Sequence, residues 1–460
     1  MIWTTKQINQ ALSLNLTDDR SYGAVQFNSN DIIKNDIFIA LPGVRDGHEF
    51  VANAINNGAS IAIVSKNIEG IDLSRLIIVD DTYQALIKLA KYKRDNVQAK
   101  FIALTGSVGK TTTKSALKMM LKSYGKTYAS HGTFNNHLGV PLTLASIPDD
   151  SEYVIIEMGM NSQGELKILS EMARPDIALI TTISEGHIEF FNSVEEIADA
   201  KCEIFQGIDS QEGIAIINCD IDNYDRCMQN INKLHLKNII TFGKNEAADI
   251  NINNIDLLED ENLRLKYLIN DEEIEILVSS IPPYFAYNFA AAFAVISALK
   301  LEIENAANVI CSFEPEIGRG KTIVTSSGSK DYIIICDYYN ANPQSMTASL
   351  KYIGQFNTKD KVAILGNMGE LGSLKYDLHM ALIEPIKKAG IIKLFLVGDL
   401  MHYIKDEFDA NIEVICFVNS KEAAIHMDQY LKGGEMILIK GSRSMKLEII
   451  AQKLGVRDAL

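Results

Sequence analysis

Short apolar runs, separated by segments long enough for a helix, recur along nearly the whole chain and restrict its fold more than any other feature. In the middle of the chain these runs are Phe101–Thr105, Tyr153–Glu157, Asp176–Ile183 and Gly213–Asn218. Runs of this kind are typical of strands buried on both faces, as in a parallel sheet covered by helices on either side. We therefore predict an α/β fold with a parallel sheet at its centre.

The same pattern continues on both sides of this central part. It predicts a small α/β unit from the apolar runs Asp36–Leu41, Ile61–Val64 and Leu76–Val79. After about residue 313 it predicts a doubly wound, Rossmann-like unit from Tyr332–Cys336, Lys361–Leu365, Lys393–Val397, Glu413–Val418 and Met436–Lys440. Residues 249–280 alternate with polar positions and predict a small antiparallel addition, and Ala286–Leu299 predicts a helix.

The chain has 460 residues, and at about 150 residues per domain this length favours three domains. We place them at residues 1–97, 98–312 and 313–460, with the polar stretch Lys93–Lys100 as the first linker.

Charge and cysteine usage exclude several classes of protein. With 44 Lys and Arg against 59 Asp and Glu, the net charge is −15, which argues against binding to nucleic acid or to an anionic membrane. Six cysteines stand singly, so neither a disulfide framework nor a structural zinc site is expected. No stretch of about 18 apolar residues occurs. We expect a cytoplasmic protein that does not insert into a membrane.

The turn after the apolar run 101–105 carries a phosphate-binding pattern with Gly106, Gly109, Lys110 and Thr111. Backbone N–H groups of such a turn surround phosphate oxygens, the lysine neutralises them, and the hydroxyl can bind Mg²⁺. ATP is the nucleotide that we expect. The full pattern has another glycine where this chain has Leu104, and a plain glycine turn between strand and helix is the alternative interpretation.

Lys201 occupies a position that the helical pattern assigns to the core. Ser193 and Glu196 form a capping box at the start of this helix, and Lys201 falls within its apolar stripe. The ammonium either reaches the surface or an ion-pair partner, or burial lowers its pKa until the neutral amine combines with CO₂. The resulting carbamate would offer anionic oxygens to a metal ion.

Two further donors follow strands of the predicted sheet. Glu157 ends one apolar run, and His187 follows another. Because ligands gather at the carboxyl ends of strands in such sheets, these residues can meet the phosphate loop. Thr111, Glu157, His187 and Lys201 together predict a site for two hard cations between ATP and a carboxylate substrate.

These residues belong to a series of motifs by which the chain resembles the Mur ligases along nearly its whole length. The motifs are Phe38–Gly43, Asp46–His48, Thr105–Thr112, Thr133–Pro141, Glu157–Gly159, Gly186–His187, Ala200–Lys201, Asn288, Gly318–Arg319, Asp337–Pro343, Gly366–Gly372 and Lys440–Ser444. Tyr339–Pro343 followed by Ser345 and Met346 is most similar to the members that join D-alanyl-D-alanine to UDP-N-acetylmuramoyl-tripeptide. The Asp-Asn-Pro-Arg signature of the member that adds the third peptide residue is not found.

The resemblance implies roles for individual residues. The ATP-binding set would be Gly106, Ser107, Val108, Gly109, Lys110, Thr111, Thr112, Asn288, Arg319 and Asp337. The catalytic residues would be Lys110, Glu157, His187 and Lys201. Thr111 and Glu157 would hold one Mg²⁺, and His187 with carbamylated Lys201 would hold the second. The substrate-binding residues would be Ser29, Asp46, Gly47, His48, Asn135, Asn136, Tyr339, Asn340 and Asn342, with the UDP-sugar in the first domain and the amine substrate in the third.

The chain departs from the family pattern at three places. Asn28 and Asn30 flank Ser29 where the family usually has Asp and Arg, and Cys336 replaces the first of two adjacent Asp residues. Tyr284 and Phe285 stand where relatives often place His-Asn ahead of Asn288.

The implied reaction starts when the tripeptide carboxylate attacks the γ-phosphate of ATP, and the amine of D-alanyl-D-alanine then attacks the acyl phosphate. Closure of the third domain over the second would bring Arg319 and Asp337 to the nucleotide. We expect a monomer with small-molecule substrates. The alternatives are another ligase of the same fold, which adds the third peptide residue or acts like a folylpolyglutamate synthetase, and a nucleotide-switched binding module.

Overall fold

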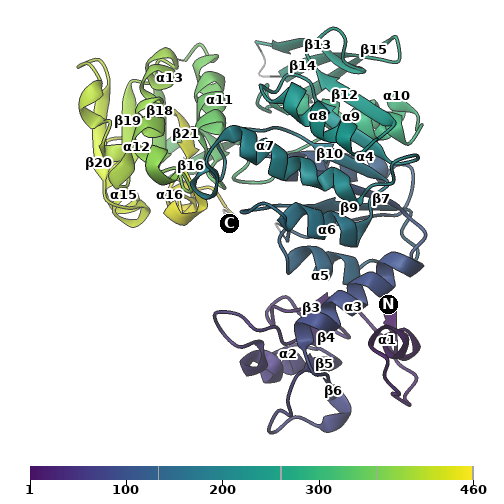
Figure 1. The fold of residues 1–460 in the computed structure, drawn as a ribbon. Coiled ribbons are helices and arrows are strands. Elements are labelled where there is room, and N and C mark those ends of the chain that lie inside the picture. The colour runs from purple at the N-terminus through teal and green to yellow at the C-terminus, as the bar shows by residue number, and fades with distance from the viewer. Residues whose placement is uncertain (133, 260–261, 359, 458–460) are drawn as a thin grey trace.

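The computed structural model describes residues 1–132, 134–259, 262–358 and 360–457. Its ribbon forms three lobes, each built around its own sheet (Figure 1). The first lobe lies at the bottom of the view, the central lobe at the upper right and the third lobe at the upper left. The predicted α/β fold class is confirmed. The exact domain boundaries after residues 97 and 312 stay a prediction.

The first lobe contains a four-stranded parallel sheet in the order β3-β4-β5-β6 and a two-stranded antiparallel pair, β1-β2. Its strands are β1 (Trp3–Thr4), β2 (Ser21–Tyr22), β3 (Val25–Gln26), β4 (Ile37–Ile39), β5 (Ile61–Val64) and β6 (Leu76–Ile78). Its helices are α1 (Thr5–Leu12), η1 (Gly47–Phe50), α2 (Val51–Asn56), η2 (Leu73–Arg75) and α3 (Thr82–Asn96).

The predicted linker at residues 93–100 is wrong in its first half. Helix α3 continues to Asn96, and the Lys93 side chain is fully buried. The Lys93 ammonium forms an ion pair with Asp149 and donates to the Ile2 carbonyl oxygen at 2.5 Å. The Trp3 indole N–H donates to the Ala145 carbonyl oxygen at 2.8 Å. The segment that we expected to be solvated therefore helps to join the first two lobes.

The central lobe has a nine-stranded sheet in the order β15-β14-β13-β12-β11-β10-β7-β9-β8. The strands are β7 (Lys100–Thr105), β8 (Thr127–Ala129), β9 (Tyr153–Glu157), β10 (Ile177–Ile180), β11 (Ile214–Asn218), β12 (Asn238–Gly243), β13 (Ile250–Leu257), β14 (Asn262–Ile269) and β15 (Glu272–Ser279). The helices are α4 (Lys110–Leu121), α5 (Gly139–Ala145), α6 (Glu165–Ala173), η3 (Ile188–Phe190), α7 (Val194–Cys202), η4 (Glu203–Gly207), α8 (Tyr224–Lys233), α9 (Phe285–Ala298) and α10 (Ile303–Ile310).

This sheet is covered on both faces, as its continuous apolar strands predict. Along β7, Phe101 and Ala103 belong to the core beneath α6 and α7, whereas Ile102 and Leu104 belong to the core beneath α4 and α9. The strands from β7 to β12 are parallel, and β13, β14 and β15 form the predicted antiparallel addition.

The third lobe has a six-stranded sheet in the order β16-β17-β21-β18-β19-β20, parallel except for the edge strand β16. The strands are β16 (Lys321–Ser327), β17 (Lys330–Asp337), β18 (Lys361–Gly366), β19 (Lys393–Val397), β20 (Glu413–Phe417) and β21 (Met436–Lys440). The helices are α11 (Pro343–Gly354), η5 (Gly372–Leu374), α12 (Lys375–Met380), α13 (Ile383–Lys388), α14 (Asp399–His402), η6 (Lys405–Glu407), α15 (Ser420–His426), η7 (Met427–Gln429), η8 (Arg443–Met445) and α16 (Glu448–Lys453).

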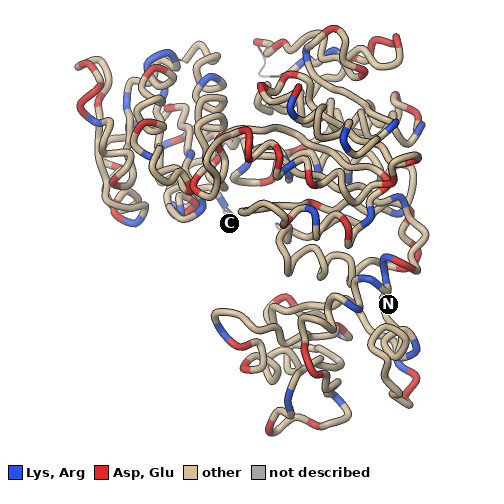
Figure 2. The backbone as a smooth tube through the Cα atoms, viewed as in Figure 1, with Lys and Arg blue, Asp and Glu red and all other residues tan. Residues whose placement is uncertain are grey.

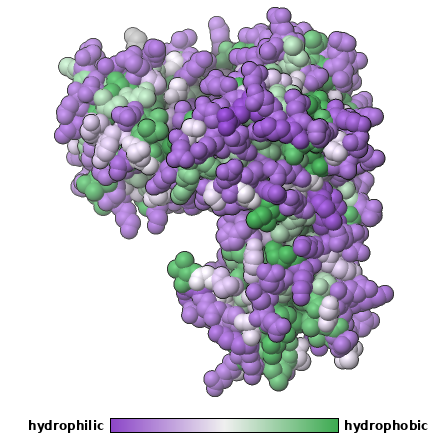
Figure 3. Space-filling view, viewed as in Figure 1, coloured by the Kyte–Doolittle hydropathy of each residue, from purple (hydrophilic) through white to green (hydrophobic). Residues whose placement is uncertain are grey.

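Charged residues are spread over the whole molecule. Figure 2 shows basic and acidic residues mixed over all three lobes, without a continuous basic stripe. Among the described residues, no helix combines the length and the apolar composition that a bilayer span requires. Figure 3 shows a wide recess between the first and third lobes, with the central lobe as its wall.

Candidate functional site

The predicted phosphate-binding and metal-binding residues gather at one edge of the central sheet. Strands β10, β7 and β9 are neighbours and run parallel, so their carboxyl ends lie together. The phosphate loop follows β7, Glu157 is the last residue of β9, and the segment with His187 follows β10. This is the edge at which doubly wound sheets bind ligands.

The phosphate loop is held tightly against its neighbours. Gly109 caps α4 with a φ of +86°, and a Cβ there would lie 2.4 Å from the Asn288 side-chain oxygen. A Cβ at Gly106 would lie 1.9 Å from the Thr181 hydroxyl. The Val108 N–H donates to the Thr182 hydroxyl at 2.9 Å. Both glycines are therefore required by the close approach of the surrounding chain.

The remaining members of the predicted phosphate loop lie on either side of the helix start. The Ser107 hydroxyl donates to the Ser184 carbonyl oxygen at 3.2 Å, and Thr112 is half-buried in the first turn of α4. The Lys110 ammonium donates to the Gly106 carbonyl oxygen at 2.6 Å, closing the loop on itself. Burial lowers the pKa of Lys110, while the Glu157 charge opposes that shift.

The Glu157 carboxylate is buried and fully engaged. Its Oε2 accepts from the Thr111 hydroxyl at 2.9 Å and lies 3.1 Å from the Lys114 ammonium, and its Oε1 accepts from the Asn135 amide at 3.0 Å. Burial alone would raise the pKa of Glu157, but Lys114, Lys110 and the bond from Asn135 lower it below its ordinary value. Glu157 is therefore an anion in the floor of the site.

Lys114 is not among the predicted site residues, although its spacing from Lys110 in the sequence indicates where it lies. It lies four residues after Lys110 and thus on the same face of α4, and only 4% of it is exposed. Its ammonium also donates to the Gly132 carbonyl oxygen at 2.5 Å.

The structure buries Lys201 as the helical pattern predicts. Lys201 lies in α7 with 1% of its surface exposed. Within the described part of the chain, its ammonium has neither a hydrogen bond nor a carboxylate at ion-pair distance. Burial, and then the charge of Lys110, lower its pKa well below the ordinary value. A buried lysine without a counterion favours the neutral amine.

The capping prediction for α7 holds in one half only. The Ser193 hydroxyl accepts from the Glu196 N–H at 3.4 Å. The Glu196 carboxylate instead accepts from the Asn192 backbone and side chain at 3.0 Å, so the reciprocal bond of a capping box is missing. The α-helix also ends at Cys202 and continues as the short helix η4.

His187 meets the third lobe. Its φ is +70°, and its Nδ1 lies 2.6 Å from Oε2 of Glu370. The Glu189 N–H donates to the Glu370 carbonyl oxygen at 3.1 Å. The His187 imidazole lowers the pKa of Glu370, and Lys110 adds a weaker effect of the same sign.

The donor set fits magnesium that is shared with a nucleotide. Among the described residues, no three His, Cys, Asp or Glu side chains form a cluster that could hold a metal ion. Mg²⁺ is usually bound by one or two carboxylates together with waters and substrate phosphates. Thr111 and Glu157, beside a phosphate loop, supply donors of that kind, and a buried amine at Lys201 could supply more after carbamylation.

Asp337 and Arg319 lie in the third lobe, where both side chains are already bonded. The Asp337 carboxylate accepts from the Lys440 ammonium at 2.8 Å and the Ser349 hydroxyl at 2.5 Å. The Arg319 guanidinium lies 3.8 Å from the centre of the Tyr339 ring, which is a cation–π contact. The Arg319 Nε also lies 3.6 Å from Glu316, whose carboxylate accepts from the Ser115 hydroxyl at 2.9 Å, so Arg319 stands beside the helix that follows the phosphate loop.

Three further predicted residues are placed by local bonds. Asn342 caps α11 by accepting from the Ser345 N–H at 2.8 Å, and its amide nitrogen lies 3.2 Å from where a Cβ on Gly186 would be. The Asn340 carbonyl oxygen accepts from Lys440 at 3.2 Å. Asn288 lies in α9 and its side-chain oxygen accepts from the Thr113 hydroxyl at 3.3 Å, beside the phosphate loop.

The departures from the family pattern have structural roles. The Tyr284 hydroxyl donates to Asp337 at 3.4 Å, and Phe285 packs in an aromatic group with Phe289 and Phe313. Cys336 is fully buried, and burial raises the pKa of its thiol to about 12. Cys336 is therefore a small core residue.

The predicted UDP-binding residues lie in the first lobe, apart from the sheet edge described above. His48 Nδ1 donates to Asp46, and its Nε2 accepts from the Ser65 N–H at 2.9 Å. Bonds from His48 and from Lys66 lower the pKa of Asp46. A Cβ on Gly47 would lie 2.7 Å from the Leu41 backbone, so this turn requires glycine.

Ser29 is buried in the same lobe, and its hydroxyl accepts from the Asn53 amide at 2.9 Å. Its neighbours are exposed, and the Asn28 side-chain oxygen accepts from the Asn30 N–H at 3.1 Å. The exposed Asn136 side-chain oxygen accepts from the Leu138 and Gly139 N–H groups at 3.1 and 3.0 Å, just ahead of α5. Of the two predicted asparagines, Asn135 is the one that contacts Glu157.

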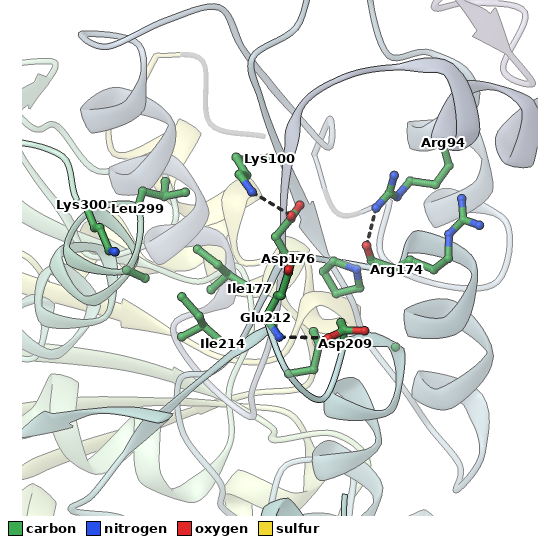
Figure 4. A pocket seen from close by; sticks show the side chains of 15 residues that line it. Arg94, Lys100, Arg174, Asp176, Ile177, Asp209, Glu212, Ile214, Leu299 and Lys300 are labelled. Carbon is green, nitrogen blue, oxygen red and sulfur yellow. Dashed lines mark hydrogen bonds and ion pairs between the residues drawn. The ribbon is translucent and has the colours of Figure 1, made fainter. Parts of the chain in front are cut away.

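A cavity of about 550 Å³ lies at the opposite edge of the central sheet, at the amino ends of β7, β10 and β11 (Figure 4). Two of its cations are already bonded: Lys100 lies 3.2 Å from Asp176, and Arg94 donates to the Arg174 carbonyl oxygen at 2.6 Å. It contains none of the predicted site residues, and we assign it no role.

Comparisons with known proteins agree with this arrangement. The family model described as Mur ligase middle domain matches residues 104–296, and the one described as Mur ligase, glutamate ligase domain matches residues 318–443. A protein of Rickettsia prowazekii named UDP-N-acetylmuramoyl-tripeptide--D-alanyl-D-alanine ligase is 43% identical over 98% of this chain and 99% of its own length.

Two solved structures are also similar over most of the chain. MurF from Acinetobacter baumannii has a TM-score of 0.83 and 28% identity, with 98% of each chain covered. MurF ligase from Thermotoga maritima, solved in complex with ADP, has a TM-score of 0.77 and 25% identity, covering 94% of this chain and 97% of its own. With the order of motifs, the sheet topology and the full-length relative in agreement, the chain belongs to the MurF group of the Mur ligase family.

Proposed function

We propose that the chain is an ATP-dependent amide ligase that joins D-alanyl-D-alanine to UDP-N-acetylmuramoyl-tripeptide, in the synthesis of peptidoglycan precursors. One observation carries this proposal: a phosphate loop and a buried carboxylate lie at one sheet edge, and the charge of Lys110 in that loop acts on a buried lysine that has no counterion among the described residues. The relative from Rickettsia prowazekii bears the name of this activity, and the structure from Thermotoga maritima contains ADP.

ATP would bind with its phosphates in the turn from Gly106 to Thr112, where Lys110 and the start of α4 supply positive charge. Asn288 beside this turn, and Arg319 and Asp337 from the third lobe, would complete the nucleotide site. Thr111 and Glu157 would hold one Mg²⁺, and His187 with Lys201 would hold the second. Bound there, these ions would withdraw charge from the phosphate oxygens and the acceptor carboxylate.

For Lys201 to bind the second Mg²⁺, its amine would first have to be carbamylated. The neutral Nζ would attack CO₂, an N–C bond would form and one proton would leave to solvent, giving a carbamate with one negative charge. Burial favours this step because it disfavours the protonated amine. The product would replace a neutral amine by an anion at the proposed metal site.

In the first chemical step, a carboxylate oxygen of the tripeptide attacks the γ-phosphorus and the bond to the β-phosphate oxygen breaks, releasing ADP. Two anions must approach each other, and Lys110 with Arg319 lowers their repulsion. In the second step, the amine of D-alanyl-D-alanine attacks the acyl carbon, loses a proton, and phosphate leaves as the amide forms. Water must be excluded until then, and contact between the central and third lobes would provide this.

The acceptor would lie in the recess between the lobes. Ser29, Asp46, Gly47 and His48 would bind its uridine end in the first lobe, and Asn135 and Asn136 its peptide. Tyr339, Asn340 and Asn342 would face the amine substrate. We further propose that the domains are residues 1–97, 98–312 and 313–460, and that the enzyme acts in the cytoplasm as a monomer.

The deciding experiment measures phosphate release from ATP by the full chain. With Mg²⁺, we expect release only when UDP-N-acetylmuramoyl-tripeptide and D-alanyl-D-alanine are both present. Parallel reactions replace them by the dipeptide acceptor with a single diamino acid, or by a pterin glutamate with glutamate. Phosphate release in only the reaction with the diamino acid would instead favour the third-residue-adding ligase. Release in only the reaction with the pterin glutamate would favour a folylpolyglutamate synthetase. Turnover that needs no amine would favour a nucleotide-switched binding module.

A further inference from the structure

A short loop of the third lobe reaches the metal-binding edge of the central lobe. The two segments are residues 369–372 and residues 187–189. Nδ1 of His187 lies 2.6 Å from Oε2 of Glu370, and the Glu189 N–H donates to the Glu370 carbonyl oxygen at 3.1 Å. A Cβ on Gly372 would lie 3.1 Å from the Glu189 backbone. The loop therefore rests on the segment that carries His187 by backbone as well as side chain.

Both residues of the pair have a backbone conformation that is uncommon outside glycine. The φ of His187 is +70° and that of Glu370 is +58°. Such residues persist where the surroundings hold them, and they are enriched at functional sites. An ordinary ion pair between surface side chains does not require a positive φ at either residue. The contact between His187 and Glu370 therefore depends on a defined backbone conformation on both sides.

The imidazole has two nitrogens, and the contact uses one of them. His187 Nδ1 is buried and makes no hydrogen bond of regular geometry to any described residue, so the Glu370 carboxylate is the ion-pair partner available to it. Nε2 is left for another ligand. Histidines that bind metals usually donate from their second ring nitrogen to a carboxylate, a backbone carbonyl or water, which fixes the tautomer and the orientation of the ring.

We infer that Glu370 is a positioning residue that orients His187 for the second metal ion and that links metal binding to the closure of the third lobe. This inference rests on the proposed function, because it takes His187 as a metal ligand. Glu370 is presented by a different lobe from the metal site, so its carboxylate reaches His187 only when the two lobes are in contact. By linkage, whatever favours metal binding through His187 then favours lobe contact by the same factor.

The test measures metal affinity without the complete reaction. Full-length wild type, E370A, E370Q and E384Q are titrated with Mn²⁺ in the presence of a non-hydrolysable ATP analogue, and bound Mn²⁺ is followed by electron paramagnetic resonance. Glu384 is an exposed carboxylate on α13 of the same lobe and serves as the matched control. We expect E370A to weaken the His187-dependent site about ten- to hundredfold, and E370Q by a smaller factor. E384Q should bind as wild type does.

A second measurement concerns closure. Small-angle X-ray scattering of wild type should show a smaller radius of gyration with nucleotide and Mn²⁺ than with nucleotide alone, and E370A should lose this difference. Wild-type Mn²⁺ affinity in E370A and E370Q would overturn the inference, as would an equal loss in E384Q. If E370A does not fold, E370Q decides by the same criteria. The Mn²⁺ titration and the scattering measurement use no acceptor substrate. Failure of the proposed function would therefore be seen separately, as wild type without acceptor-dependent phosphate release.

Discussion

At the scale of single residues, Lys201 combines two properties that conflict in an ordinary protein. Only 1% of its surface is exposed, and no described residue supplies a counterion. Burial of an unpaired ammonium costs free energy of folding. A buried lysine without a counterion is expected where the amine is neutral or chemically modified and where that form takes part in the function.

The first prediction concerns activity. Lys201→Ala should keep the fold but lose most of the acceptor-dependent phosphate release, since the variant cannot form the proposed carbamate. Added acetate should restore part of the activity by supplying a carboxylate in the space left by the side chain. The measurement is a steady-state rate with and without acetate, and wild type with acetate is the control. Normal activity of Lys201→Ala would falsify the carbamate hypothesis.

The second prediction concerns stability. In buffer free of CO₂ and metal, Lys201→Met should unfold at a higher temperature than wild type, with a gain of about 1 kcal/mol or more. The folded-state pKa of Lys201 lies below its ordinary value, so between these two values the unfolded chain binds more protons. Wild-type stability therefore rises with pH in that window, and the gap to Lys201→Met should narrow between pH 7 and pH 10. A gap that widens would contradict this account.

At the scale of elements, the start of α4 depends on a glycine for two separate reasons, a left-handed φ and a close neighbour. In Gly109→Ala both apply, because φ is +86° and the new Cβ would lie 2.4 Å from the Asn288 side chain. Gly434→Ala is the matched control, with a φ of +91° and open space around it. Each should lose roughly 1–2 kcal/mol from backbone strain.

Only Gly109→Ala should also weaken ADP binding, by about tenfold or more, which calorimetric titration measures. Equal ADP affinity in the two variants would show that the Asn288 contact does not shape the phosphate loop.

The long apolar strands were predictable because burial on both faces leaves a continuous pattern. Strands β7, β9, β10 and β11 follow from it, as does α9 from its alanine-rich sequence. Strands β3, β8 and β16 were not predicted. The first two have only two and three residues, and β16 is a half-exposed edge strand rich in Thr and Ser, so none of them shows a buried run.

The candidate site was predictable where a residue type conflicts with its position or completes a spacing, as at Lys201 and in the phosphate loop. The contact of Glu370 with His187 was not, because it joins residues 183 positions apart through the meeting of two lobes. The burial of Lys93 was missed for the same reason: its partners Ile2 and Asp149 come from distant parts of the chain.

At the scale of the whole molecule, the Lys93–Asp149 ion pair is one of the contacts that join the first and central lobes. Asp149→Asn leaves this buried ammonium without its counterion, which should lower stability by about 1–3 kcal/mol. The double variant Lys93→Met with Asp149→Asn should recover most of the loss, because it removes the charge that needs compensation. Differential scanning calorimetry measures the first unfolding transition. If the single and the double variant unfold alike, the ion pair has no part in this junction.

The meeting of the loop 369–372 with His187 also offers a way to interrupt the enzyme. A small molecule bound between Glu370 and His187 would keep the central and third lobes apart without occupying the proposed nucleotide site or acceptor site. Such an inhibitor would need no likeness to ATP or to a cell-wall precursor, and rising substrate levels would not compete it away directly.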